Sequence, residues 1–317
     1  MRKEAKKRQN VNTSYVQGYH QGGHGSEAYA FAGFEGNWYF NSDRKIELDG
    51  NYQRTDGQSL KGYGLEIETE CYGILSDKAY ATVLDNVILA GFKFGKSMFK
   101  LQSDCTLHGR SNAEIITQIM TRERIRNDYS AYKAMWEEHF RTFDVRTDSA
   151  ITGCGMHVNI SLGCFGSKKE TQDLAIRKLF YIVNRHYDVC KKLFYRAGCT
   201  DWCGQMNYSV AKTMDLNNMS PSHGNCMNYS HYGAGRIEIR LVGGQKDYFC
   251  FRNTMESIFH LVDRVQEISW ADCDDLFKVF EGCNNYVMKR LPDCGLSADL
   301  LERIRETVKT VDYEITH

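Results

Sequence analysis

The strongest constraint on the fold is the alternation of apolar and acidic residues in the segment GLEIETE, residues 64–70. Its three carboxylates occupy positions 66, 68 and 70, and the residues between them are uncharged. Successive side chains of a β-strand point to opposite faces of the sheet, so the pattern predicts a strand with one apolar face and one row of carboxylates. An ordinary half-buried strand with its acidic side in water gives the same pattern, so this segment alone does not identify a site.

Two later segments have the same design. The segment CGMHVNISL (residues 154–162) and the segment RIEIRL (residues 236–241) both alternate between aliphatic and polar residues. The polar positions are His157, Asn159 and Ser161 in the first segment and Arg236, Glu238 and Arg240 in the second. Three strands are therefore expected to combine an aliphatic face for the core with an opposite face of acids, bases and a histidine.

The polar faces of these strands would meet if the strands lie in one sheet. Carboxylates that crowd together repel and raise one another's pKa unless a cation lies among them. Mg²⁺ prefers oxygen ligands and commonly carries phosphate, and arginine binds phosphate oxygens in bidentate fashion. The combined face therefore predicts a metal and nucleotide site.

Composition restricts the class of protein. The 317 residues suffice for one large domain or two ordinary ones, and Lys+Arg and Asp+Glu both number 40, so bulk charge predicts neither a nucleic-acid nor a membrane partner. The basic start is not followed by an apolar stretch, and no apolar run approaches the ~20 residues of a membrane helix, so no signal peptide or membrane span is expected. Twelve cysteines without an export signal predict reduced thiols and a cytoplasmic location.

The chain is predicted to consist of an N-terminal extension and one catalytic domain. Residues 1–25 are charged and then rich in glycine, which predicts a flexible segment. Residues 26–60 form a short β-rich segment with a hairpin signal at Asp49-Gly50. The catalytic domain covers residues 61–317, and its C-terminal part is helical from about residue 250.

Helical periodicity places the helices of this domain. Apolar residues at helical spacing predict helices over 77–91, 126–143, 171–195 and 251–268, and serines 269 and 297 begin two shorter ones. The aromatic stripe at positions 129, 132, 136 and 140 is interpreted as core packing. Residues 198–235 are rich in Gly, Asn, Ser and Cys, and this composition predicts loops over the site. The expected fold class is α+β, with a curved, mainly antiparallel sheet and helices packed on one face.

The segments GLEIETE, AEIIT (residues 113–117), GCGMHVNISL and RIEIR, in this order, resemble the glutamine-synthetase-like carboxylate–amine ligases. The branch they resemble most is the amidoligases, which are common in bacterial and phage genomes. GCGMHVNISL is close to the Gly-Met-His-x-His-x-Ser-Leu segment of glutamine synthetases, and RIEIR matches their Arg-Ile-Glu-x-Arg segment. The resemblance covers residues 62 to 262 and implies a sheet of the glutamine-synthetase-like catalytic type.

The resemblance also implies roles for individual residues. It makes Glu66, Glu68, Glu114, His157 and Glu238 metal ligands, with Asp104 as a further acid. It makes Arg240, with Arg236 near it, the holder of the transferred phosphate, and it places Asn159 and Arg196 at the nucleotide. The implied cofactors are ATP and Mg²⁺ or Mn²⁺, and Glu66, Glu238 and Arg240 would be catalytic.

The implied reaction activates a carboxylate with ATP as an acyl phosphate, which an amine attacks to give an amide, ADP and phosphate. Asn159 departs from the family pattern, because the family has a second histidine there, and the loop that gates ammonia in the synthetases is not recognisable in residues 198–235. These departures argue against glutamine synthesis and for another amine acceptor. The acid is expected to be an amino acid, a peptide or a protein group.

Three alternatives remain open on the sequence alone. The first is a zinc site built from Cys199, Cys203, His223, Cys226 and His231, whose spacings are not those of paired zinc knuckles. The second is a phosphotransferase on the same fold, which would use the same acids and arginines but would release no amide. The third is a catalytically inactive binding protein that has kept the fold.

Overall fold

The protein is described by a computed structural model. It describes residues 28–30, 38–41, 44–47, 61–71, 80, 83–84, 87, 99–102, 111–117, 119–148, 152–197, 202–218, 224–311 and 313. The segment 1–25 and the Asp49-Gly50 turn, both subjects of predictions, lie outside these residues. Of the helix predicted over 77–91, the described residues 80, 83, 84 and 87 are helical.

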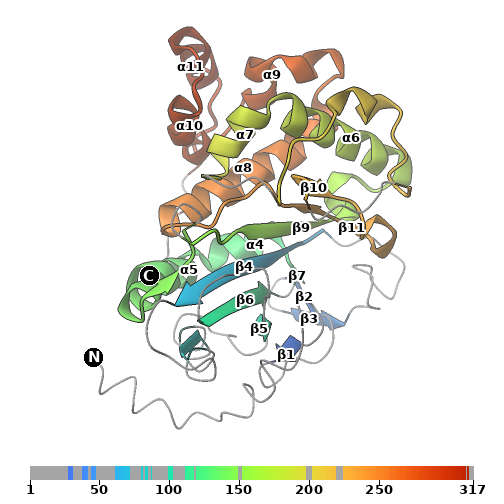
Figure 1. The fold of residues 1–317 in the computed structure, drawn as a ribbon. Coiled ribbons are helices and arrows are strands. Elements are labelled where there is room, and N and C mark those ends of the chain that lie inside the picture. The colour runs from blue at the N-terminus through green and yellow to red at the C-terminus, as the bar shows by residue number, and fades with distance from the viewer. Residues whose placement is uncertain are drawn as a thin grey trace.

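The fold combines helices with one mainly antiparallel sheet, which confirms the predicted mixed class (Figure 1). Seven strands follow one another with every neighbouring pair antiparallel. In spatial order they are β1 (Ala28–Ala30), β5 (Phe99–Gln102), β6 (Ser111–Thr117), β4 (Tyr63–Cys71), β9 (Met156–Ser161), β11 (Arg236–Ile239) and β10 (Met227–Asn228). The nine-residue strand β4 lies at the centre of this order.

Four short strands complete the sheet. They are β2 (Trp38–Asn41), β3 (Arg44–Glu47), β7 (Ile119–Met120) and β8 (Val145–Arg146). β2 and β3 pair antiparallel, with Asn41 opposite Arg44, and β2 runs parallel to β7. The segment 26–60 thus contributes β1, β2 and β3 to the same sheet as β4.

The central strands have one apolar face, and helices cover it. Leu65, Ile67, Val158 and Ile237 are fully buried on this face. The ring of Tyr63, which shares their side of β4, meets the ring of Phe259 edge to face at 4.8 Å. Phe259 belongs to α8 (Tyr248–Glu267), and in Figure 1 α8 and α6 (Lys169–Arg185) lie together on one side of the strands. Alternation in the strands therefore separates a helix-covered core from the polar face opposite.

Two predicted helices are divided in the structure. The segment 126–143 includes the end of α4 (Arg122–Asn127), then α5 (Tyr129–Ala134) and the π-helix η2 (Met135–Phe140). Its aromatic stripe is buried in the core, as predicted. The segment 171–195 was predicted as one helix, but it forms α6 and α7 (Tyr187–Leu193). The break falls at His186, whose backbone leaves the helical region and whose Nε2 lies 2.9 Å from the carbonyl oxygen of Cys273.

The C-terminal part is helical, as predicted. Its elements after α8 are η6 (Ala271–Asp274), α9 (Leu276–Phe280), α10 (Asn285–Arg290), η7 (Leu291–Cys294) and α11 (Ala298–Arg305). Helix α11 begins after Ser297, whose Oγ accepts a hydrogen bond from the Leu300 N–H at 3.3 Å. The Oγ of Ser269 accepts one from the Asp272 N–H at 3.2 Å, at the start of a 3₁₀ turn. Among the described helices, none has the length and apolar character that a membrane crossing requires.

A buried carboxylate ties the helices together. Glu256 of α8 is fully buried and accepts hydrogen bonds from the Arg126 guanidinium at 2.8 and 2.9 Å, from the Tyr129 hydroxyl at 2.7 Å and from the Asn284 amide at 2.9 Å. Each donor comes from a different segment. Because a buried charge is tolerated only when it is paired and hydrogen-bonded, this carboxylate fixes how α4, α5 and the start of α10 meet α8.

The half-buried imidazole of His260 in α8 predicts a pH dependence of stability. Burial lowers the pKa of His260 from 6.5 to about 4, although its hydrogen bond to the Val279 carbonyl opposes this. The unfolded chain takes up a proton below pH 6.5, whereas the folded chain does so only near pH 4. This contribution to the free energy of unfolding is therefore fully present above pH 6.5 and decreases by roughly 3 kcal/mol as the pH falls to about 4.

The test compares wild type with His260→Gln, because glutamine can donate the same hydrogen bond without titrating. Denaturant unfolding between pH 7 and 4 should show a smaller loss of stability in the variant by about that amount. Parallel pH curves for the two proteins would contradict the assignment.

Candidate functional site

The pairing register brings the predicted polar residues together on one face. Across β4 and β9, Glu66 lies opposite His157. Across β4 and β6, Glu68 lies opposite Glu114. Directly opposite residues of an antiparallel pair share a face of the sheet, so these four side chains line the same surface. The three segments that the sequence predicted to share a sheet do share it, and β6 adds Glu114.

The centre of this surface is a group of three side chains, which we call the acidic cluster: Glu66, Glu114 and His157. One ligand atom from each lies within 4.8 Å of those of the other two. Glu114 is 2% and His157 is 6% exposed, whereas the Glu66 side chain keeps 22% of its surface accessible. Carboxylates held this close in a buried setting are stabilised by a cation, so the cluster has the donors and the spacing of a metal site.

Glu66 is held in its ionised form. Its Oε1 accepts a hydrogen bond from the Asn159 amide at 2.8 Å, and its Oε2 lies 3.2 Å from His157 Nδ1. Burial raises the pKa of Glu66, but the hydrogen bond and charge of His157, the charge of Arg236 and the Asn159 bond outweigh it and bring the pKa to about 2. The carboxylate is therefore available to a cation throughout the physiological pH range.

His157 is surrounded by carboxylates. Its Nδ1 lies 3.3 Å from Glu238 Oε1 in addition to Glu66, and its Nε2 lies 3.6 Å from Glu68 Oε1. Burial lowers the pKa of His157, but the Glu66 hydrogen bond, with the charges of Glu238 and Glu68, raises it above the ordinary value. A metal ion at this ring would replace the proton, so metal binding and protonation compete here.

Gly155 fixes Glu68 and brings Arg196 beside it. The Gly155 N–H donates to Glu68 Oε2, and the Glu68 N–H donates to the Gly155 carbonyl at 3.1 Å. A Cβ at position 155 would lie 3.1 Å from an Arg196 guanidinium nitrogen and 3.2 Å from Glu68 Oε2. A side chain there would crowd both charged groups, so glycine allows them to approach the strand. Arg196, which follows α7, thereby lies near the site and also donates to the Val242 carbonyl at 3.3 Å.

Glu238 is bonded on both of its oxygens. Its Oε1 accepts from the Arg240 guanidinium at 2.7 Å, and its Oε2 accepts from the Asn228 amide at 2.8 Å. Glu238 lies beside the acidic cluster and is not one of its three members. Asn228 was not predicted as a site residue, because residues 198–235 were predicted as loops and the two-residue strand β10 is too short to show alternation. The short spacing from Asn228 to Ser230 is the available signal, since it is typical of an Asx turn.

The buried polar atoms without a hydrogen-bond partner among the described residues include two from alternate positions of β9. They are Asn159 Oδ1 and Ser161 Oγ, and their residues are 2% and 0% exposed. Their neighbours at the start of β4 are glycines. Gly64 of β4 lies opposite Asn159, and the carbonyl of Gly62, just before β4, accepts from the Ser161 N–H at 2.9 Å. An unsatisfied buried polar atom costs about 1–3 kcal/mol, so a ligand group that bonds to these atoms would recover that energy.

The remaining predicted residues lie at the edges of this face or outside the described residues. Arg236 is half-buried opposite Ser161, at the end of β11. Glu70 is buried at the far end of β4, opposite Arg146. Asp104 lies outside the described residues.

The zinc alternative involves two cysteines that the structure describes. Cys199 and His223 lie outside the described residues, as does the rest of segment 219–223. The buried Cys226 thiol donates to Asn184 Oδ1 at 3.1 Å, and burial raises its pKa to about 12. Within the described part of the chain, the acidic cluster is the one group of three or more potential ligands close enough to hold a metal.

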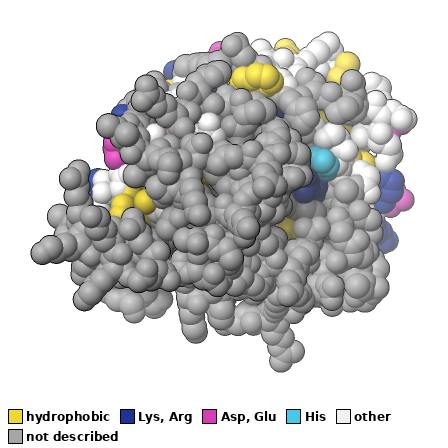
Figure 2. Space-filling model, turned by 60° about the horizontal axis from the view of Figure 1, so that its bottom comes forward, with side chains coloured by type: hydrophobic (Ala, Val, Ile, Leu, Met, Phe, Trp, Pro, Cys, Tyr) yellow, Lys and Arg dark blue, Asp and Glu magenta, His cyan; other side chains and the backbone are white. Residues whose placement is uncertain are grey.

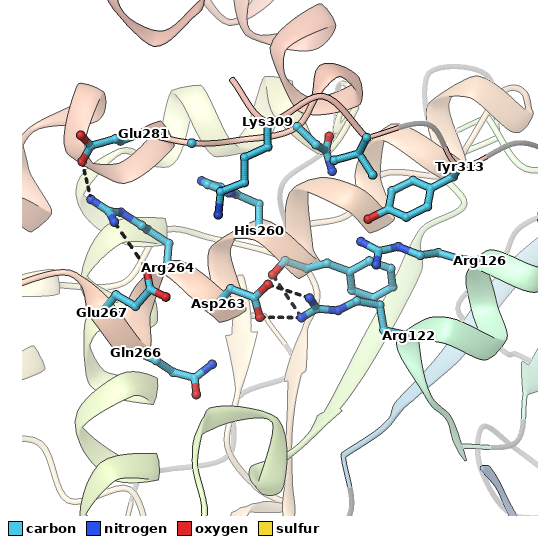
Figure 3. A pocket seen from close by; sticks show the side chains of 14 residues that line it. Arg122, Arg126, His260, Asp263, Arg264, Gln266, Glu267, Glu281, Lys309 and Tyr313 are labelled. Carbon is cyan, nitrogen blue, oxygen red and sulfur yellow. Dashed lines mark hydrogen bonds and ion pairs between the residues drawn. The ribbon is translucent and has the colours of Figure 1, made fainter. Parts of the chain in front are cut away.

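The described surface seen from the lower side of Figure 1 is of mixed type. Figure 2 shows single basic, acidic, histidine and hydrophobic side chains there, consistent with the equal totals of acidic and basic residues. A separate cavity of about 480 Å³ lies between α4, α8 and the C-terminal segment (Figure 3). Its arginines are paired: Arg122 with Asp263 at 2.6 Å, and Arg264 with Glu281 at 2.9 Å. These contacts join helices, and we assign the cavity no ligand.

Compared with known proteins, the chain matches no protein-family model and no curated protein.

The acidic cluster predicts a divalent-cation affinity that can be measured without a substrate. Wild type should bind Mn²⁺ in calorimetry, and Glu114→Gln should weaken the affinity by about tenfold or more, because it removes a charged ligand from a three-member group. The control is Glu302→Gln, which removes an exposed carboxylate of α11 that pairs with Arg305, three residues further along the chain. Equal affinities for Glu114→Gln and wild type would contradict the cluster.

Proposed function

We propose that the protein is an ATP- and Mg²⁺-dependent carboxylate–amine ligase of the glutamine-synthetase-like, amidoligase type. The observation that carries the proposal is the acidic cluster of Glu66, Glu114 and His157, with the bonded pair Glu238 and Arg240 beside it. This combination brings carboxylates, an imidazole and a guanidinium together on one sheet, and these groups could bind a cation and a phosphate. Such an arrangement suits phosphoryl transfer, in which catalysis is mostly positioning and charge stabilisation.

The residues present fit a divalent metal with bound nucleotide. Glu66, Glu68, Glu114 and Glu238 supply hard oxygen donors, and His157 adds a nitrogen that Mn²⁺ accepts readily. Mg²⁺ with ATP would supply the phosphoryl group and neutralise part of its charge. The orphaned Asn159 Oδ1 and Ser161 Oγ support a ligand on this face, because their hydrogen bonds remain to be made.

The arginines have roles that follow from their positions. Arg240 is buried and donates a hydrogen bond to Glu238, which holds its guanidinium in one orientation. In that orientation the guanidinium would bind phosphoryl oxygens. Arg196 lies against Gly155 and Glu68, and Arg236 lies at the open end of the same face. Together they would bind the nucleotide phosphates, with Arg240 at the transferred group.

The proposed reaction is balanced in two steps. A substrate carboxylate oxygen attacks the γ-phosphorus of ATP, the bond to the bridging oxygen breaks, and ADP leaves. An amine then attacks the carbonyl carbon of the acyl phosphate, loses a proton, and phosphate departs, which leaves an amide. Arg240 would stabilise the charge on the transferred phosphoryl oxygens. Glu238 and Glu66 would bind the divalent metal ions that accompany ATP.

The substrates would be an amino acid, a peptide or a protein group as the acid, with an amine other than ammonia. The neutral Asn159 stands where the glutamine synthetases have a histidine, so a cationic contact to substrate or phosphate is absent from that position. The equal numbers of acidic and basic residues favour such substrates over a nucleic acid, and we propose a cytoplasmic location.

The experiment is an assay of ADP release with Mg·ATP, a panel of amino acids and peptides, and hydroxylamine as a surrogate amine. Hydroxylamine traps acyl phosphates as hydroxamates, so ADP and hydroxamate should form together on the correct acid. Glu238→Gln should abolish both products while leaving the melting temperature close to wild type, because glutamine keeps the shape of the side chain and removes its charge. The exposed-carboxylate variant Glu302→Gln should retain activity.

The same assay separates the alternative functions. A phosphorylated acceptor without hydroxamate would indicate a phosphotransferase and would contradict the ligase assignment. The absence of Mg·ATP binding in calorimetry would contradict both enzymatic proposals and favour a binding protein. Full activity of Glu238→Gln would exclude the assigned role of Glu238.

A further inference from the structure

Asn228 has its side-chain amide fixed at both ends. Its Oδ1 accepts a hydrogen bond from the Ser230 N–H at 3.0 Å, and its Nδ2 donates to Glu238 Oε2 at 2.8 Å. The orientation of the amide follows from chemistry: a backbone N–H needs the oxygen, and a carboxylate needs the nitrogen. Asn228 is 2% exposed and lies directly opposite Glu238 in the β10–β11 pair.

The turn therefore determines the direction of the donor. Once the Ser230 N–H holds the amide oxygen, the amide nitrogen faces β11. The local Asx turn and the strand register therefore fix the hydrogen bond from Asn228 to Glu238.

Glu238 transmits this constraint to the rest of the site. Its second oxygen accepts from Arg240 and lies 3.3 Å from His157 Nδ1. A carboxylate with one donor on each oxygen cannot rotate without breaking a buried hydrogen bond. The orientation of Glu238 in turn limits where the Arg240 guanidinium and the His157 ring can lie.

Asn228 fixes the carboxylate without neutralising it. Arg240 already pairs with the other oxygen of Glu238, and the amide at position 228 adds a second hydrogen bond without adding a second positive charge. Hydrogen bonds from neutral groups behind a metal-binding carboxylate commonly set its orientation, and their loss costs about 10- to 100-fold in metal affinity.

We propose that Asn228 is a positioning residue that orients Glu238 and, through it, His157 and Arg240. This inference rests on the proposed function, because it takes the cation-binding role of this face as given.

The test is a double-mutant cycle read by Mn²⁺ affinity in calorimetry. Asn228→Ala should weaken Mn²⁺ binding by about 10- to 100-fold in the wild-type background. In the Glu238→Ala background the same change should have no further effect, because Asn228 acts only through Glu238. A purely structural role would instead weaken binding by the same factor in both backgrounds, and that result would overturn the proposal, as would wild-type affinity of Asn228→Ala.

Two further variants keep the cycle interpretable. Asn228→Ser keeps a small polar side chain that cannot span to Glu238, and it should reproduce the loss if Asn228→Ala does not fold. Asn217→Ala is the matched control, because Asn217 is exposed and its side chain bonds only to Asp215 among the described residues; it should bind Mn²⁺ as wild type does.

A second readout needs no metal. In ¹⁵N-labelled protein the Asn228 side-chain amide should give a separate NMR signal that shifts in Glu238→Ala, while the Asn217 amide signal stays in place. Failure of wild type to bind Mn²⁺ would contradict the proposed function, and the amide signal would then decide on Asn228 alone. An Asn228 signal unchanged by Glu238→Ala would overturn the positioning role.

Discussion

The site depends on the register between β4 and its neighbours, because register decides which side chains share a face. Glu68 lies opposite Glu114 and Glu66 lies opposite His157, and both pairs are held in the middle of the sheet. A slip of one residue would turn the acids toward the helices and the aliphatic side chains toward the site. The apolar face prevents such a slip, since Leu65 and Ile67 are fully buried in the hydrophobic core.

Neutral hydrogen-bond donors orient three of the carboxylates on this face. The Asn159 amide bonds Glu66, the Asn228 amide bonds Glu238, and the backbone N–H of Gly155 bonds Glu68. Each of these donors satisfies a carboxylate oxygen without cancelling its charge. Arg240 and His157 offset part of the negative charge of this buried face, and a bound cation would lower its electrostatic energy further.

The sequence predicted the part of the site that lies on long, alternating strands. GLEIETE and GMHVNISL show a period of two over six or more residues, and that pattern is sufficient to assign the face of each side chain. It could not predict Asn228, because β10 has two residues and pairs only through tertiary structure. The helix break at His186 was missed for the opposite reason: the apolar period continues through it, and a hydrogen bond to the distant Cys273 ends the helix.

Under the proposed function, Asn159 stands where the glutamine synthetases have a histidine, and this difference would change what the face offers a ligand. One N–H of the Asn159 amide donates to Glu66, and Asn159 Oδ1 has no hydrogen-bond partner among the described residues, so this oxygen can accept a hydrogen bond from a ligand. A protonated histidine would present a donor there and would favour an anion. An amide oxygen beside Ser161 and two glycines instead suits a ligand group that carries an N–H or O–H. A ligand that donates a hydrogen bond here would satisfy Asn159 Oδ1 and recover the energy that its burial costs.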